Sequence, residues 1–593
     1  MNIRIFLSCA ALLAAALARA GAAEKSGAWI ILSDNEAKAE LAIRSAKDFG
    51  VGQIQLSHNI IHDLREIRSE KKRALVSRLA NLAHSEGIGE VLLWDHCLYP
   101  LGYYPDRFKT GPRGAINFDD PEFWEWFKRD YREMLDLAPG ADGVVLTFIE
   151  TGARAEGQHS VKMKTPAEKL AAVVNAVADV VVGERKKRLV IRTFAYSDRE
   201  YEATVGCIRH IKEPSVTLMV KETPHDFFLT HPDNAFAGKT DRPTIIEFDT
   251  GNEYNGQGIT ASTWPEYVLK RWKNFMKNPN VAGYAARVDR YGDTSIVGTP
   301  NEVQLYALKR AAEDPSVDAG AVLDEFIASR YGKAALPNLR GAFSKAFEIA
   351  MCSFYTLGTN TADHSALNYM ENQWAYTRHV SGRWLNPPSV KVGHGVDRTF
   401  HYWKDVINAI SPAKYKSPKS PFASEIREVF EKGWLEPGEG MDEFFYGCVM
   451  AEKSFGARLA ESALAEVEAA KPHMKPEDFE AVAGLFRRTS LTARLHEAVC
   501  EAYYGSRLLA RGPEFRTPEL EAGVRGAAER IRLISDEMKA LGRGCPAGQY
   551  NWLGDAKRAM RHGEAALAAA GLSGKSGGPH GPDGAKNKGE PRP

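Results

Sequence analysis

Acidic residues follow three apolar runs of this chain, and carboxyl groups in that position could act as acids or bases. The runs VTLMV and PTIIEF have the composition of buried parallel strands and are followed by Asp226 and Glu253, while GVVLTF is followed by Glu150. Cleavage of a glycosidic bond requires a carboxylic acid that protonates the leaving oxygen and a carboxylate that activates water or attacks the sugar. Glu150, Asp226 and Glu253 are therefore candidates for the carboxyl groups of such a site.

An alternation of strands and helices must position these carboxylates. Helical segments with start signals separate most of the apolar runs, including the capping boxes Thr165-Pro-Ala-Glu168 and Thr263-Trp-Pro-Glu266. Eight such units over roughly 290 residues fit an α/β fold of the TIM (β/α)8 barrel type better than a doubly wound sheet. The predicted strands lie at 28–34, 53–59, 90–96, 142–148, 188–194, 216–222, 243–249 and 281–289.

The ends of the chain and the region after the barrel have different compositions. A short apolar run behind a basic start predicts a signal peptide over 1–23, so we expect an exported protein, periplasmic or extracellular. The barrel is predicted over 27–314. Helical periodicity without strands predicts an all-α C-terminal domain over 315–571, and a Gly-, Pro- and Lys-rich stretch predicts a disordered tail over 572–593.

Charge and cysteine content restrict the function classes. The chain has 77 Lys and Arg against 76 Asp and Glu, which gives no indication of a nucleic-acid partner, and no later segment is long and apolar enough for a membrane span. The six cysteines beyond the signal peptide are scattered, with no histidine at ligand spacing. We predict no metal and no cofactor, leaving disulfide pairing and oligomeric state open.

Further polar residues at predicted strand ends are candidates for binding an oligosaccharide substrate, because the carboxyl edge of a barrel is where pockets form. Glu247 and Asp249 share parity inside an apolar run, so both must face a wet or hydrogen-bonded cavity. Either could instead form structural ion pairs with barrel cations. The predicted substrate-binding residues are Arg192, Lys221, Asp95, His96 and Asp249.

Two segments resemble motifs of glycoside hydrolase family 67, the α-glucuronidases. MVKETPHDF (219–227) looks like that family's VKxxPxDF segment, and EFDTGNEYNGQ (247–257) resembles its EFQxxxEYxGQ segment without a gap. The resemblance implies that Asp226 and Glu253 lie opposite the acid. VIRTFAY (190–196) is similar to the strand that carries a substrate-binding arginine, here Arg192, and the matching lysine is Lys221.

The similarity extends to the helical region and also has departures. GVDRT (395–399) resembles the family's GFDRT, but the family's N-terminal β-domain has no counterpart. Glu150 matches the family's acid only after a shift of one residue, so Glu156, which precedes Gly-Gln as in the family, is a rival. A carboxylate-binding lysine of the family falls on Thr147, which puts uronate specificity in doubt.

The resulting prediction is an exported TIM-barrel glycoside hydrolase with an inverting acid/base mechanism, acting on an oligosaccharide with a possible terminal uronic acid. One alternative is a non-catalytic carbohydrate-binding protein that kept the barrel and lost the acid. Another is a glycosidase of different sugar specificity. The acid after the fourth strand distinguishes an enzyme from a binding protein.

Overall fold

A computed structural model describes residues 26–148, 150–193, 198–223, 226–229, 233–356, 359–367, 443–542 and 544–573 of the 593-residue chain. The predicted signal peptide over 1–23 and the motif at 395–399 lie outside the described residues, as does all but the start of the predicted tail over 572–593.

Eight parallel strands close into a barrel in sequence order, with β1 paired to both β2 and β8. This confirms the predicted TIM barrel, and each predicted run overlaps a strand, although the first two strands begin two residues before the predicted runs. The predicted ends run one to three residues too far except for the third run, which matches its strand. The strands are β1 (Ser26–Ile31), β2 (Val51–Leu56), β3 (Glu90–His96), β4 (Gly143–Thr147), β5 (Arg188–Thr193), β6 (Thr217–Lys221), β7 (Thr244–Phe248) and β8 (Val281–Arg287).

Alternating side chains of the strands fill the barrel interior and divide it into layers. The lower layers are mostly apolar, because Ala28, Val145 and Met219 pack there with Trp94, whose indole N–H donates to the buried Gln55 at 3.0 Å. Two residues further along each strand, at its carboxyl end, the side chains that point into the barrel are polar. These inward polar residues are His96, Thr147, Arg192, Lys221, Glu247 and Arg287.

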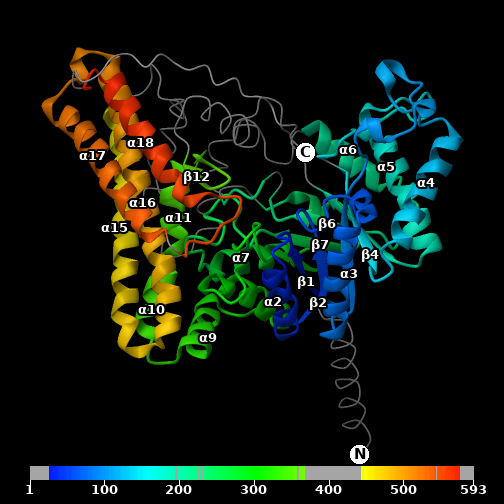
Figure 1. Cartoon of the computed structure of the whole chain (residues 1–593), viewed down its shortest axis with the longest axis horizontal. Coiled ribbons are helices and arrows are strands. Elements are labelled where there is room, and N and C mark those ends of the chain that lie inside the picture. Colours follow the sequence, from blue (N-terminus) through cyan, green and yellow to red (C-terminus); the bar gives the residue numbers. More distant parts are fainter. Residues whose placement is uncertain are drawn as a thin grey trace, which may run out of the picture.

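Helices surround the barrel on its outside (Figure 1). They are α2 (Glu36–Ala46), α3 (Glu70–Ser85), α4 (Pro121–Asp136), α5 (Pro166–Ala178), α6 (Asp198–Ile208), α7 (Pro265–Phe275) and α8 (Val303–Glu313). The predicted capping box at Thr165 and Glu168 is present. The one predicted at Thr263 is wrong, because its hydroxyl donates to the carbonyl of Phe343 in the helical region instead.

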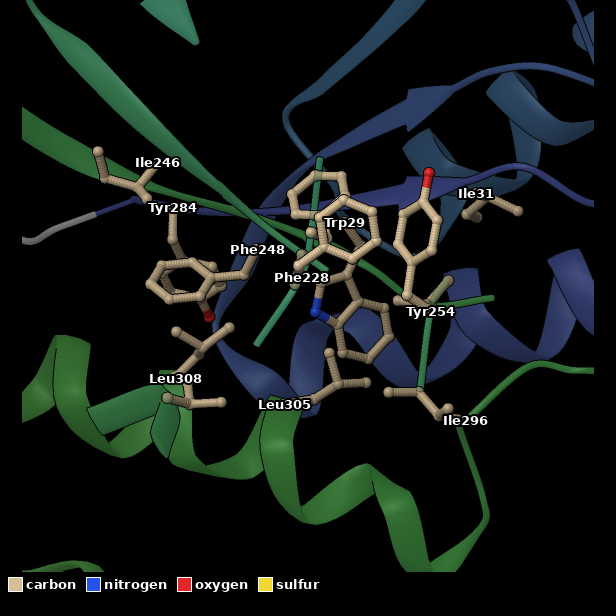
Figure 2. Packing of buried hydrophobic residues seen from close by; sticks show 14 of the residues in the cluster. Trp29, Ile31, Phe228, Ile246, Phe248, Tyr254, Tyr284, Ile296, Leu305 and Leu308 are labelled. Atoms are coloured by element: carbon tan, nitrogen blue, oxygen red, sulfur yellow. The ribbon is translucent and has the colours of Figure 1, made fainter. Parts of the chain in front are cut away.

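The main core lies between the strands and these helices, as Figure 2 shows around Trp29. Trp29 of β1 is fully buried and packs beside Leu305 of α8, while Tyr284 of β8 lies near Leu308 of the same helix. The same core continues to the carboxyl end of the barrel, where the rings of Phe228 and Tyr254 are 4.4 Å apart. Core packing therefore supports the loops that follow β6 and β7.

The C-terminal region is helical and lies to one side of the barrel (Figure 1). The predicted helical C-terminal region is confirmed, and four two-residue strands in two antiparallel pairs lie between its helices. These are β9 (Tyr355–Thr356), β10 (Thr359–Asn360), β11 (Ala362–Asp363) and β12 (Ala366–Leu367). The helices are α9 (Ala319–Tyr331), α10 (Leu336–Ser344), α11 (Ala346–Phe354), α15 (Glu443–Ala470), α16 (Pro476–Arg511), α17 (Pro518–Leu541) and α18 (Trp552–Ala569).

Hydrogen bonds join the helical region to the loop that follows β7. Thr489 of α16 accepts from the backbone N–H of Ala261 at 2.8 Å, and Arg488 donates to the carbonyl of Ile259 at 2.8 Å. Tyr355 accepts from the N–H of Leu229 at 2.9 Å and donates to Asn255 at 2.7 Å. The helical region thus holds the loops after β6 and β7 from outside the barrel.

Two sequence expectations concern the environment of the chain. Within the described ranges, no helix combines the length and apolar character needed to cross a membrane. Among the described residues, Cys97, Cys207, Cys352 and Cys545 form no disulfide.

Glycine at position 143 is required by the close approach of its neighbours in the barrel. A Cβ there would lie 2.3 Å from the carbonyl oxygen of Arg188, whereas a Cβ at Gly52 in β2 would meet nothing within 4 Å. We expect Gly143→Ala to lower the free energy of unfolding by about 1–3 kcal/mol in denaturant titrations, because the added carbon overpacks the sheet. Gly52→Ala is the matched control, and equal stability of the two variants would contradict this expectation.

Candidate active site

A buried carboxylate, Glu247, lies at the centre of the polar layer. Arg192 donates to its two oxygens from Nε at 2.6 Å and Nη2 at 3.2 Å, and Arg287 donates from Nε at 2.9 Å. Burial opposes the charge on Glu247, but the two guanidinium groups outweigh it and lower its pKa to about 2. Glu247 is therefore a structural ion-pair partner, which was the alternative left open by its sequence.

Glu253, predicted on the base side, is held between two arginines. Its Oε2 accepts from Arg287 Nη1 at 3.0 Å and its Oε1 from Arg290 Nη2 at 2.5 Å, while His364 Nε2 lies 3.3 Å from Oε1. Burial works against the charge, yet Arg290, His364 and Arg287 together hold the pKa of Glu253 far below its usual value. The carboxylate is therefore ionised throughout the physiological range and fixed in orientation.

Asp226, the other residue predicted on the base side, lies in the same layer. Lys221 Nζ donates to its Oδ1 at 2.8 Å, and the hydroxyl of Tyr254 donates to its Oδ2 at 2.9 Å. The ammonium group of Lys221 also lies 4.7 Å from the centre of the Phe227 ring. Lys221 is thus engaged with a protein carboxylate and an aromatic face.

Glu150, the predicted acid, joins these groups from the end of β4. The residue is exposed at the barrel mouth, but its carboxyl lies deep enough among protein groups that burial raises its pKa. The nearby cations Lys221 and Arg192 oppose that rise, and Asp226 and Glu253 add to it. A glutamate with a raised pKa retains its proton to higher pH, as a general acid must.

The backbone of Glu150 has a φ of 61°, in the left-handed region that non-glycine residues seldom adopt. Such a conformation costs of order 1–3 kcal/mol and persists only where the surrounding structure enforces it. Strain of this kind is concentrated at functional sites. The left-handed backbone at Glu150 is therefore consistent with a functional role for this residue.

The rival acid, Glu156, lies outside the cluster. It pairs with Arg154, which also binds Glu200 at 2.7 Å, and it lines a separate cavity of about 390 Å³ between α5 and α6. The shift of one residue at the end of β4 thus brings Glu150 to the site. Thr147, which replaces the lysine of the resembled family, is buried in the barrel, and its hydroxyl has no hydrogen-bond partner among the residues that the structure describes.

Asp95 does not join the site, which corrects the prediction that it binds substrate. It alternates with the inward Trp94 and His96, so its side chain points outward to the helices. There it accepts from the N–H of Leu64 and the hydroxyl of Tyr99, each at 3.0 Å, and from Tyr131. Burial raises the pKa of Asp95 to about 7. Its role is to join β3 to the surrounding helices.

Aromatic and imidazole rings form the opposite wall of the mouth. His96 stacks on His62 at 3.9 Å, and His58 lies 5.4 Å from Trp94 and 5.8 Å from Tyr291. Burial keeps the pKa of His58 and that of His96 well below the usual range, so both rings are neutral at pH 7. Neutral imidazoles and aromatic faces suit the hydroxyls and apolar face of a sugar ring.

Asp249 binds the backbone of Glu253 through a hydrogen bond. Its Oδ2 accepts the backbone N–H of Glu253 at 2.6 Å, and its own N–H donates to Glu222 at 3.1 Å. Burial raises the pKa of Asp249, with Arg287 opposing and Glu253 adding to the shift. Asp249 thus holds the backbone of a candidate catalytic residue, and no contact in the described part of the chain gives it a direct role in binding sugar.

Three residues of the site were not assigned a role from the sequence. Tyr254 lies in the EYNGQ segment, and a phenol beside the proposed base could have been inferred from that position. Arg290 lies three residues after the inward Arg287, in a loop without a distinctive pattern. His364 comes from the helical region and has no sequence signal. Among the described side chains, no group of three or more His, Cys, Asp or Glu is arranged to hold a metal ion.

Known proteins resemble this chain in structure. A GH138 enzyme targeting pectin rhamnogalacturonan II superposes with a TM-score of 0.50, covering 88% of this chain and 62% of that one at 11% sequence identity. This chain shares its fold with a glycoside hydrolase. A GH115 4-O-methyl-α-glucuronidase with specificity for decorated arabinogalactans has a TM-score of 0.47 at 11% identity, covering 91% of this chain and 62% of its own.

The chain thus spans about 62% of the length of each of these two enzymes. No family model matches its sequence, and no curated protein matches it either. The comparisons therefore show a shared fold alone. Membership of family 67 in particular stays a prediction from the motifs at 219–227 and 247–257.

The buried Glu222 below the site makes stability depend on pH. Burial raises its folded-state pKa to about 7, above the usual glutamate value of 4.5, although Arg271 opposes the shift. The folded chain therefore loses stability as pH rises through this interval, at about 1.4 kcal/mol per unit. We expect Glu222→Gln to gain about 3 kcal/mol relative to the natural chain between pH 4.5 and 7. Urea unfolding at both pH values measures this, and parallel stability curves would contradict it.

Proposed function

We propose that this protein is an exported glycoside hydrolase that cleaves an oligosaccharide by an inverting acid/base mechanism, in the periplasm or outside the cell. The observation that carries the proposal is the convergence of Glu150, Asp226 and Glu253 on one polar layer at the carboxyl end of the barrel. The glycoside hydrolase fold supports it, while the reaction rests on the side chains.

Glu150 acts as the general acid in this proposal. Burial raises the pKa of its carboxyl, and the charges of Lys221, Asp226 and Glu253 act on it, so it holds a proton to higher pH and can donate it to the leaving oxygen. Glu156 is excluded from this role, since it is paired with Arg154 beside α5.

Asp226 and Glu253 divide the work on the base side. Glu253 is bound by two guanidinium groups that stabilise its anion, which makes it a weak base but a well-oriented acceptor for a water hydrogen. Asp226 is held by one ammonium group and one phenol. We assign proton abstraction from water to Asp226 and orientation of that water to Glu253.

The cations at the site favour a sugar with less negative charge than the uronic acid that the resemblance to family 67 implies. Arg192 and Lys221, which would bind a uronate, already contact Glu247 and Asp226, and the third cation of the resembled family is replaced by Thr147. A second candidate function is therefore hydrolysis at a neutral sugar, for which the unpartnered Thr147 hydroxyl and neutral His96 are suitable partners.

Product analysis distinguishes these two candidates. The purified protein is incubated with a panel of uronate-bearing and neutral oligosaccharides, and the released sugar and its anomeric form are identified by NMR. Release of a single sugar with inverted configuration supports the proposal and identifies the specificity. Retention of configuration would contradict the division of roles between Asp226 and Glu253, and binding without cleavage would favour the carbohydrate-binding alternative.

Removal of the acid should affect substrates according to their leaving group. We expect Glu150→Gln to lower kcat on the natural linkage by about 10²- to 10⁴-fold, because the leaving oxygen is no longer protonated. On the fluoride of the same sugar, whose leaving group needs no proton, the variant should approach the natural rate. Steady-state kinetics on both substrates measure the contrast. Glu156→Gln is the matched control with near-normal rates, and equal losses on both substrates would remove the acid role from Glu150.

The pH dependence provides a separate measurement of the acid. A general acid must be protonated, so the raised pKa of Glu150 extends activity to higher pH than an ordinary glutamate would allow. The basic limb of the kcat/KM profile should therefore lie above the usual glutamate range and should be absent from the fluoride profile of Glu150→Gln. A basic limb that survives in this variant would belong to another group.

A further inference from the structure

A hairpin of the helical region, residues 362–367, rests on the loop that carries Glu253. The hydroxyl of Ser365 donates to the carbonyl of Glu253 at 2.9 Å and accepts the N–H of Gly256 at 2.9 Å. Gln257 Nε2 donates to the carbonyl of His364 at 3.0 Å and to that of Glu253 at 3.0 Å. The turn between β11 and β12 is thus joined to the loop at Glu253 and at the residues that follow it, Gly256 and Gln257.

His364, at the tip of this hairpin, reaches the predicted base side directly. Its Nε2 lies 3.3 Å from Glu253 Oε1, and its ring lies 5.1 Å from the ring of Tyr254. Tyr254 in turn donates to Asp226. The His364 side chain is 32% exposed, so it is part of the surface at the mouth and not of the core.

The backbone at the tip is in an uncommon conformation. His364 has a φ of 46° and Ser365 a φ of 71°, both in the left-handed region. Two consecutive residues of this kind cost of order 1–3 kcal/mol each, and the hydrogen bonds to the Glu253 loop offset that cost. A regular turn with glycine would avoid the strain, so the strain indicates that a side chain is needed at this position.

The last helix anchors the same hairpin from its other side. The N–H of Leu367 donates to Asp555 of α18 at 3.0 Å, and Asp555 also accepts from the hydroxyl of Tyr550 at 2.5 Å. The N–H of Tyr550 donates to Gln257 at 2.8 Å. The hairpin, α18 and the Glu253 loop therefore form one connected unit.

We propose that His364 is a positioning residue of the active site, supplied by the helical domain to orient the Glu253 carboxylate and the Tyr254 ring. The inference rests on the proposed hydrolase function. A carboxylate has only acceptors, so His364 donates its Nε2–H to Glu253 Oε1. With Arg290 on the same oxygen and Arg287 on the other, this third donor limits rotation of the carboxylate and keeps it aimed at the water that Asp226 deprotonates.

Two substitutions of His364 distinguish a role in orienting the Glu253 carboxylate from a role in stabilising the fold. We expect His364→Ala to lower kcat about 10- to 100-fold with KM changed less than threefold, because Glu253 becomes mobile while the sugar contacts remain. His364→Gln should recover at least tenfold of that loss, since its Nε2 can donate at nearly the same place. His562→Ala, a loss of buried imidazole in α18, is the control for destabilisation of the same domain. Equal kcat for His364→Ala and the natural chain would overturn the proposal, as would a Gln variant no better than Ala.

A stability measurement tests the contact without any substrate. In a double-mutant cycle of His364→Ala and Glu253→Gln, thermal melting should show a double variant whose loss in Tm is smaller than the sum of the single losses. Additive shifts would mean that the two side chains do not interact and would overturn the proposal. If the natural chain cleaves no oligosaccharide, the hydrolase function fails, whereas this cycle still decides whether His364 positions Glu253.

Discussion

The ion pairs buried at the barrel mouth determine the positions of the other groups in the site. Removing Glu247, Arg192 and Arg287 from water costs several kcal/mol per ion, and close charge-assisted hydrogen bonds must compensate for it. Each guanidinium group is therefore fixed in one orientation. Because Arg287 binds Glu247 through Nε and Nη2 and Glu253 through Nη1, the fixed core charge also fixes the carboxylate in the loop above it. A polar layer of this kind is rigid without any bound ligand.

Much of the fold could be predicted from the sequence because parallel strands buried on both faces leave uninterrupted apolar runs. The ends of the runs were less certain, since the first residues beyond a strand are often apolar or acidic, as at Phe148 and Glu222. The carboxylates of the site could also be predicted, because Asp226 and Glu253 follow the ends of two neighbouring strands and Glu150 the end of an earlier one. Chain order alone brings such residues to one edge of a barrel.

The remaining parts of the site depend on contacts that the sequence does not encode locally. Asp95 could have been excluded by strand parity, since Trp94 and His96 on either side of it point inward. His364 could not have been found, because it lies more than a hundred residues after Glu253 in a segment with no motif. Only the docking of two regions brings it to the carboxylate. The choice between Glu150 and Glu156 likewise required the path of the loop after β4.

The hydrogen bond between Gln257 and Tyr550 joins residues 293 positions apart. During synthesis, all eight strands have emerged long before Tyr550, so the barrel can close while the loop around Glu253 still lacks its outer contacts. The loop reaches its final arrangement only when α18 docks. A nascent or partly folded chain therefore already has the barrel ion pairs that hold Glu253, but it lacks the contacts that Tyr550 supplies to the loop beyond it.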